Sequence, residues 1–196
     1  MFANRYTALV DACVLAGALK RNLLLTLAEA DFFRVRWSLE ILDETERAIA
    51  HMLAQKAVQD AQERALRARQ AMERAFQEAA VQDHEALLGA VPELPDPGDQ
   101  HVVAAAMKTR AAVIVTDNLK HFPAALLAPL GIDVLSADAF IADTITLDTG
   151  RAVAAIRRMR ERLKRPEKTA DVLLLDMEAN GLTETVDALR PHQESL

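Results

Sequence analysis

The stretch from Asp96 to Pro123 constrains the fold of this chain most, because it specifies a helix, a buried strand and a polar loop in succession. Its first residue can cap a helix, Pro97 suits the first helical position, and small apolar residues follow over 102–106. Residues 113–115 form a β-branched run without polar alternation, which is typical of a strand buried on both faces. Polar residues at 116–118 then emerge at the strand's carboxyl end, where open α/β sheets bind their ligands. The stretch therefore predicts an α/β unit that directs polar side chains toward one crevice.

The rest of the chain repeats this alternation of strands and helices. Further strands are predicted at 6–10, 33–37 and 132–135, each of them short and apolar or alternating. The predicted helices cover 15–30 with a break near 20–22, 39–54 after Ser38 as N-cap, 58–80, 124–130 and 138–145. The segment 58–80 is rich in Ala, Gln, Glu and Arg, which indicates an exposed arm or a dimer contact. Strands separated by helices predict an α/β fold with a parallel sheet flanked by helices.

Composition changes near residue 147, where we place a domain boundary. Residues 1–146 form the predicted α/β domain, and residues 147–196 form a small all-helical C-terminal region. In that region helices are predicted from 148 to Lys164, after which Pro166 breaks the chain, from Thr169 to 181, and from 184 to 189. With 196 residues, 51% of them hydrophobic, the chain can bury one sizeable core and an appendage.

The compartment and the class of partner are limited by cysteine content and charge. No run is long enough to span a membrane, no secretory signal is evident, and Cys13 is the single cysteine, so we expect a cytoplasmic protein without disulfides. We expect Cys13 to be a buried, inert thiol. The net charge of −6 excludes binding of nucleic acid by broad electrostatic attraction alone, but it permits binding through a divalent cation or to a basic partner segment.

Acidic and amide side chains come from four separate segments of the chain. They are Asp11 after the first strand, Glu44 in a helix, Asp99 at a helix start, and Asp117 with Asn118 after a strand. If they converge, they form a hard-oxygen pocket suited to Mg²⁺ or Mn²⁺. Such an ion activates water and polarises a phosphoryl oxygen, which is chemistry suited to phosphodiester hydrolysis.

Each of these residues also has a structural interpretation. Asp99 can complete a capping box begun by Asp96, Asp11 can cap the next helix, and Glu44 can be a solvated residue of its helix. The pair at 117–118 can be ordinary turn formers. His101 and His121 lack partners at ligand spacing, so we expect neither to bind metal and expect His101 to pack beside its helix. The run from Arg157 to Arg165 is either a solvated helix face or a patch for a phosphate backbone.

Four motifs in this order resemble the PIN-domain family. They are Val10-Asp11-Ala12-Cys13-Val14-Leu15, Trp37-Ser38-Leu39-Glu40-Ile41-Leu42-Asp43-Glu44, Asp96-Pro97-Gly98-Asp99-Gln100-His101-Val102-Val103-Ala104-Ala105-Ala106 and Ile114-Val115-Thr116-Asp117-Asn118-Leu119-Lys120-His121-Phe122-Pro123. Within that family the chain looks like the VapC-type toxins of bacterial toxin–antitoxin pairs, in a subgroup with an extra helical C-terminal region. The motifs cover about residues 4 to 145.

The resemblance implies a Mg²⁺- or Mn²⁺-dependent endoribonuclease that is inhibited by an antitoxin, whose tail enters the acidic groove, and that forms a homodimer. It implies that Asp11 and Asp99 are the primary metal ligands and that Glu44 completes the pocket. Asn118 matches the fourth position of the family site, and Thr116 matches the hydroxyl that orients water on the metal.

This sequence departs from the family pattern at two positions. Asn118 brings no charge to the fourth position, so Asp117 is a further candidate metal ligand if its side chain turns inward. His121 replaces an acidic residue expected before Phe122.

Two other functions are open on the sequence. One is a catalytically weak PIN-like module that binds RNA or protein, with the arginines at 157, 158 and 160 as its contacts. The other is an α/β phosphotransfer protein that uses a strand-end aspartate. Phosphatases of that type carry a second aspartate two residues after the first, whereas this chain has Cys13 two residues after Asp11, which counts against them.

Overall fold

A parallel β-sheet forms the centre of the protein, with strand order β3-β2-β1-β4-β5. The computed structural model describes residues 6–163 and 167–196, and within them the sheet has five strands. Their bounds are β1 Thr7–Val10, β2 Arg34–Ser38, β3 Ala80–Val81, β4 Val113–Val115 and β5 Asp133–Leu135. All four pairings are parallel. The predicted fold class is therefore confirmed, with β1 at the centre and its neighbours β2 and β4 on either side.

Helices connect the strands and continue into the C-terminal region. Their bounds are α1 Ala12–Ala16, α2 Ala18–Glu29, α3 Leu39–Gln55, α4 Ala61–Ala75, α5 Gln100–Thr109, α6 Ala124–Leu127, α7 Ala137–Leu147, α8 Thr149–Arg162, α9 Ala170–Ala179 and α10 Thr183–Leu189. Short 3₁₀ turns are η1 Gln77–Ala79, η2 Glu85–Ala90, η3 Pro97–Asp99, η4 Leu119–His121, η5 Ala128–Leu130 and η6 Arg190–Ser195.

Two expected helices differ from the observed ones, and one strand was not predicted. The first long helix breaks at Gly17, where the backbone is extended, and not at 20–22. The helix expected over 58–80 is α4 alone, which is followed by η1 and by the strand β3. β3 has two residues, too few to show the alternation by which a strand is read from sequence.

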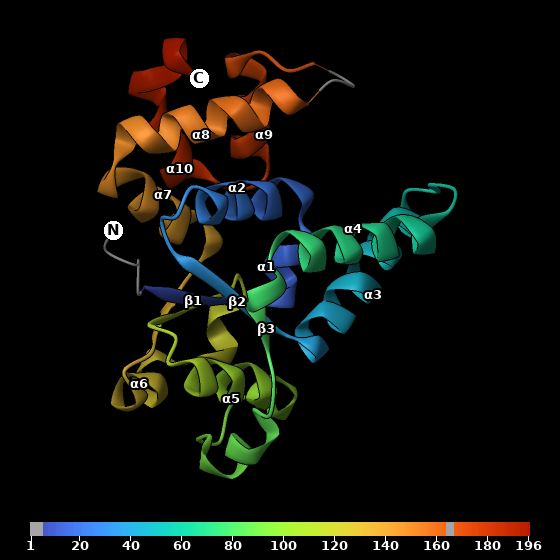
Figure 1. The fold of residues 1–196 in the computed structure, drawn as a ribbon, viewed down its shortest axis with the longest axis vertical. Coiled ribbons are helices and arrows are strands. Elements are labelled where there is room, and N and C mark those ends of the chain that lie inside the picture. The colour runs from blue at the N-terminus through green and yellow to red at the C-terminus, as the bar shows by residue number, and fades with distance from the viewer. Residues whose placement is uncertain (1–5, 164–166) are drawn as a thin grey trace.

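The two faces of the sheet are covered by different helices, as Figure 1 shows. Helix α5 packs across β1, β2, β3 and β4 on one face. Helix α2 lies on the other face, beneath α8 and beside α7. The small side chains at 102–106 of α5 are almost all fully buried, so this helix can approach the strands closely. Helices α3 and α4 pack against each other and project away from the sheet, as expected of an exposed arm.

The C-terminal helices are joined to the α/β part through α7. Asp138 of α7 is buried, and its carboxylate accepts hydrogen bonds from the backbone N–H groups of Glu184 (2.9 Å) and Thr185 (2.8 Å) at the start of α10. This contact crosses the boundary predicted at 147, because α7 precedes it and α10 follows it. Among the described residues, no helix is long and apolar enough to cross a membrane.

Several arginines of α8 have partners within the chain. Arg160 donates to the backbone oxygens of Leu196 (3.0 Å) and Lys168 (2.7 Å), and Arg162 lies 3.3 Å from Glu29 of α2. Lys164, Arg165 and Pro166, which belong to the predicted basic run and helix stop, lie outside the described residues. The basic face of α8 thus offers less free charge to a phosphate backbone than its sequence indicates.

Candidate active site

Asp11 and Thr116 are brought together by the register of two neighbouring parallel strands. Val10 of β1 pairs with Val115 of β4, so the residues that follow them leave the same edge of the sheet side by side. The Asp11 amide donates to the Val115 carbonyl (3.0 Å), and the Thr116 hydroxyl donates to Asp11 Oδ2 (2.7 Å). Both side chains are buried. Asp11 Oδ1 also accepts from the Ala12 amide (2.6 Å), so the structural interpretation of Asp11 as a helix cap is confirmed.

Asp99 points toward the loop after β4 and does not complete a capping box. Asp96 caps η3 by accepting from the Gly98 amide (2.9 Å), whereas Asp99 Oδ2 lies 2.8 Å from Nδ1 of His121. The Asn118 amide lies 2.7 Å from the same ring nitrogen. Asp96, Asp99 and His121 each offer one ligand atom within 4.8 Å of the others, which makes them a possible metal site.

Glu44 reaches the site from α3 and meets His101 of α5. Glu44 Oε1 lies 3.4 Å from His101 Nε2, and Glu40, one helical turn earlier, lies 3.5 Å from His101 Nδ1. His101 is nearly buried, whereas the Glu44 side chain is 39% exposed, so Glu44 stands at the accessible rim. Glu44 is thus partly solvated and also lies beside His101.

The pKa shifts show that these acidic groups share one electrostatic environment. Burial raises the pKa of Asp99, and the charges of Asp11 and Asp96 raise it further, although the hydrogen bond from His121 opposes the shift. Burial by itself would lower the pKa of His101, but the carboxylates of Glu44, Glu40 and Asp11 outweigh it and raise that pKa. The charge of Asp11 therefore raises the pKa of both Asp99 and His101. This indicates that the carboxylates at the end of β1, on α3 and at the start of α5 lie in one region.

Asp117 and Asn118 have different surroundings. Both oxygens of Asp117 are engaged, one by Lys20 of α2 (2.6 Å) and the other by the Ala137 amide at the start of α7 (3.2 Å). The Asn118 backbone amide donates to the Thr116 hydroxyl (3.1 Å), and its side chain meets His121. Asn118 thus lies beside His121, which contacts Asp99. Asp117 connects α2 to α7. Its role as a metal ligand remains a prediction.

Cys13 is exposed on α1, contrary to the expectation of a buried thiol. Its sulfur nevertheless lies 3.1 Å from Asp11 Oδ2 and 3.3 Å from the Thr116 hydroxyl oxygen. Desolvation and the charge of Asp11 raise the pKa of Cys13 to about 12. The thiol is therefore protonated at neutral pH, and the expected lack of nucleophilic character follows from its neighbours.

The donor set fits a hard divalent cation. Asp11, Glu44 and Asp99 supply carboxylate oxygens, and the charges of Asp11 and Asp96 add to burial in raising the pKa of Asp99. The structure thus brings together Asp11, Thr116, Asp99 and Asn118, and it brings Glu44 within the electrostatic reach of Asp11 through His101.

Sequence reasoning missed the contacts of the two histidines. We expected neither to bind metal, and this stays a prediction, but His121 contacts Asp99, and His101 lies between Glu40 and Glu44. His101 follows Asp99 by two residues and His121 follows Asn118 by three, so proximity to the predicted site residues was the signal available in the sequence.

Comparison with known proteins gives two family matches and one curated relative. Residues 7–120 match a family described as PIN domain, and residues 137–191 match one described as VapC50 C-terminal domain. A protein of Mycobacterium tuberculosis strain H37Rv, named "Putative ribonuclease VapC50", is 43% identical over 76 residues, which are 39% of this chain and 45% of the relative. The chain thus spans less than half the length of the curated relative it matches. No solved structure matches the chain significantly.

Proposed function

Because the chain belongs to the PIN-domain family, we propose that it is a divalent-metal-dependent endoribonuclease and the toxin of a type II toxin–antitoxin pair. The observation that carries the proposal is the meeting of Asp11, Thr116 and Asp99 at the carboxyl edge of a parallel sheet, with Glu44 at its rim. Open α/β sheets place their reaction centres at this edge.

Asp11 and Asp99 would hold the metal, and Glu44 would complete the pocket. Mg²⁺ or Mn²⁺ bound there would polarise a phosphoryl oxygen and lower the pKa of a bound water. Thr116 fixes the orientation of Asp11 through its 2.7 Å hydrogen bond, and His121 fixes Asp99. These contacts preorganise the carboxylates, so little reorganisation is needed when an RNA phosphate arrives.

Glu44 is the residue we assign to orient the attacking water. It is the most exposed of the three carboxylates, and His101 holds one of its oxygens. A carboxylate at the rim can accept a proton from water without leaving the site. Asn118 contributes through its amide near His121 and brings no charge.

We propose that the protein acts in the cytoplasm and that it has three partners. The substrate is RNA, and the inhibitor is an antitoxin whose basic segment enters the acidic groove. The net charge of −6 and the carboxylates at the sheet edge support a basic inhibitor. The third partner is a second copy of the chain. The arm formed by α3 and α4 supports a homodimer, since Met52 and Leu66 are exposed apolar side chains on it.

A second candidate is a PIN-like module that binds RNA or protein with little catalysis. It is favoured by the uncharged Asn118 and by the engagement of Asp117 with Lys20 and Ala137, which leave the fourth position of the site without a free carboxylate. Contacts through Arg160 do not support it, because that guanidinium already binds two backbone carbonyls.

The test is cleavage of a structured RNA pool with Mg²⁺, with Mn²⁺ and with EDTA, by the wild type and by Asp99→Asn. We expect metal-dependent cleavage by the wild type and a loss in the variant that exceeds the roughly 10–100-fold caused by removing an outer-shell partner. Asp187→Asn, an exposed aspartate of α10, is the matched control and should cleave normally. Folded, antitoxin-free protein that cuts in no condition would contradict the proposal and favour the binding module.

A further inference from the structure

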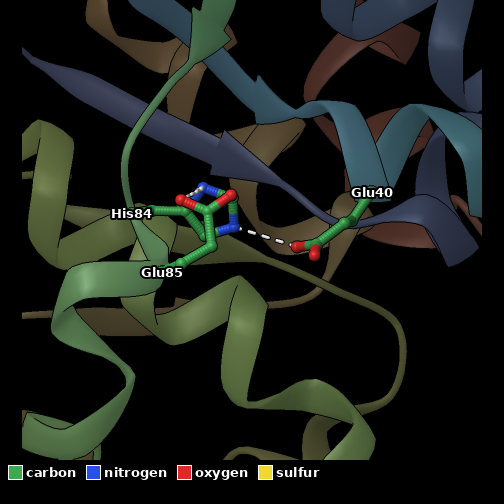
Figure 2. Close-up of side chains that lie close together, drawn as sticks. All are labelled: Glu40, His84 and Glu85. Carbon is green, nitrogen blue, oxygen red and sulfur yellow. Dashed lines mark hydrogen bonds and ion pairs between the residues drawn. The ribbon is translucent and has the colours of Figure 1, made fainter.

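A second group of side chains that could bind a metal includes Glu40, which lies one helical turn before Glu44 on α3. Glu40 in the first turn of α3, His84 before η2 and Glu85 at the start of η2 each offer one ligand atom within 4.8 Å of the others. Figure 2 shows the Glu85 carboxylate beside the His84 ring, with dashed lines from the ring to Glu85 and to Glu40. None of the three was a candidate for the ribonuclease site.

His84 is the unusual member, because it is buried and one ring nitrogen has no partner. Its side chain is 4% exposed, and Nε2 lies 2.9 Å from Glu40 Oε2. Nδ1 is buried and, among the described residues, has no hydrogen-bond partner. The nearest acidic oxygen, Glu85 Oε2, is 3.9 Å away, which is too far for a hydrogen bond. A buried polar nitrogen without a partner is costly, so its persistence calls for a ligand.

One neutral tautomer of the ring is suited to a cation as that ligand. In it, Nε2–H donates to Glu40 and Nδ1 carries a lone pair that faces the Glu85 carboxylate, so two acceptors face each other. A cation between them satisfies both. The carboxylate on Nε2–H then orients the ring, as carboxylates do for histidine ligands of metals.

We propose that His84 Nδ1 and the carboxylate of Glu85 bind a first-row transition dication of the Zn²⁺ type, with Glu40 orienting the ring and water completing the coordination. An imidazole ligand suits such ions, whereas Mg²⁺ prefers a site made of oxygens alone. The pocket of Asp11, Asp99 and Glu44 is of the oxygen type, so the two sites differ in the metal they select.

The site would link the segment after β3 to α3. Glu40 Oε2 also lies 3.5 Å from His101 Nδ1, and His101 Nε2 lies 3.4 Å from Glu44. The two sites are therefore neighbours joined through Glu40 and His101, and the test must separate them.

Zn²⁺ is the probe, titrated into the full chain in excess Mg²⁺ so that the oxygen pocket is occupied. Binding is measured by calorimetry and by NMR of the histidine rings. We expect one Zn²⁺ per chain and a shift of the His84 ring resonances. Glu85→Gln and His84→Gln should weaken this binding at least roughly tenfold. His51→Gln, on the exposed face of α3, is the matched control and should bind as the wild type does.

Glu85 has a 61% exposed side chain, so Glu85→Gln tests the site even if the buried His84 variant fails to fold. Equal Zn²⁺ affinity in Glu85→Gln and wild type would overturn the proposal, as would the absence of Zn²⁺ binding in the wild type. Shifts confined to His101 or His121 would place the ion in the ribonuclease pocket and overturn it too. Since the readout is metal binding, an inactive ribonuclease would leave this result unaffected.

Discussion

Replacing Thr116 with valine isolates the contact that orients Asp11. The hydroxyl donates to Asp11 Oδ2 at 2.7 Å and accepts from the Asn118 amide at 3.1 Å, and the side chain is fully buried. Valine has nearly the same shape, so Thr116→Val removes both hydrogen bonds without opening a cavity. Asp11 Oδ2 then keeps its contact with the Cys13 thiol (3.1 Å).

The expected magnitude follows from the hydrogen bond to a charged acceptor. Such a bond contributes about 1.5–3 kcal/mol. Because about 1.4 kcal/mol corresponds to a tenfold change in an equilibrium constant, the Mn²⁺ concentration for half-maximal cleavage should rise roughly 10–100-fold. The maximal rate should largely recover at saturating Mn²⁺, since Asp11 itself is still present.

The assay is RNA cleavage as a function of Mn²⁺, with thermal unfolding measured on the same samples. Thr144→Val is the matched control, because Thr144 is a buried threonine whose hydroxyl donates to the Phe140 carbonyl (2.7 Å) of its own helix. It should leave the Mn²⁺ dependence unchanged. An unchanged Mn²⁺ dependence in Thr116→Val would refute the reasoning, and so would a loss of rate that saturating Mn²⁺ does not restore.

Two further predictions concern stability. Asp138→Ala leaves the amides of Glu184 and Thr185 without their acceptor, so it should lower the free energy of unfolding by about 2–4 kcal/mol in urea titrations, while exposed Asp187→Ala should change it by less than about 0.5 kcal/mol. In metal-free protein the raised pKa of His101 means that the folded state holds the proton more tightly than the unfolded state. This stabilisation is complete below the ordinary pKa of 6.5 and is lost as pH rises through the folded pKa. The Tm measured in EDTA should therefore fall over that range, and the fall should be absent in His101→Gln. A parallel fall in the variant would assign it to another group.

The part of the site that follows from strand order could be predicted from sequence. Asp11 and Thr116 each follow a buried apolar strand, and parallel strands end at a common edge, so their proximity needs only the prediction that these strands are neighbours. The sheet and its flanking helices follow from the same alternation.

The rest of the site depends on packing between distant segments. His101 meets Glu40 and Glu44 because α5 and α3 approach each other at the sheet edge, which no local pattern encodes. The side-chain direction of Asp117 is decided by Lys20 and Ala137, which are remote in sequence. Spacing alone could not distinguish a capping box at Asp99 from a site residue, because both require an acid at that position.

Asp117 connects helix α7, which packs against α10, to the loop that carries the proposed site residues Thr116 and Asn118. One of its oxygens accepts from the amide of Ala137, the residue at which the family match to the C-terminal domain begins, and its two neighbours are Thr116 and Asn118. A binding event that displaces α7 would move Asp117, and with it Thr116, whose hydroxyl donates to Asp11. We therefore expect removal of the C-terminal helices to change the position of the loop at 116–118, and with it the proposed ribonuclease site.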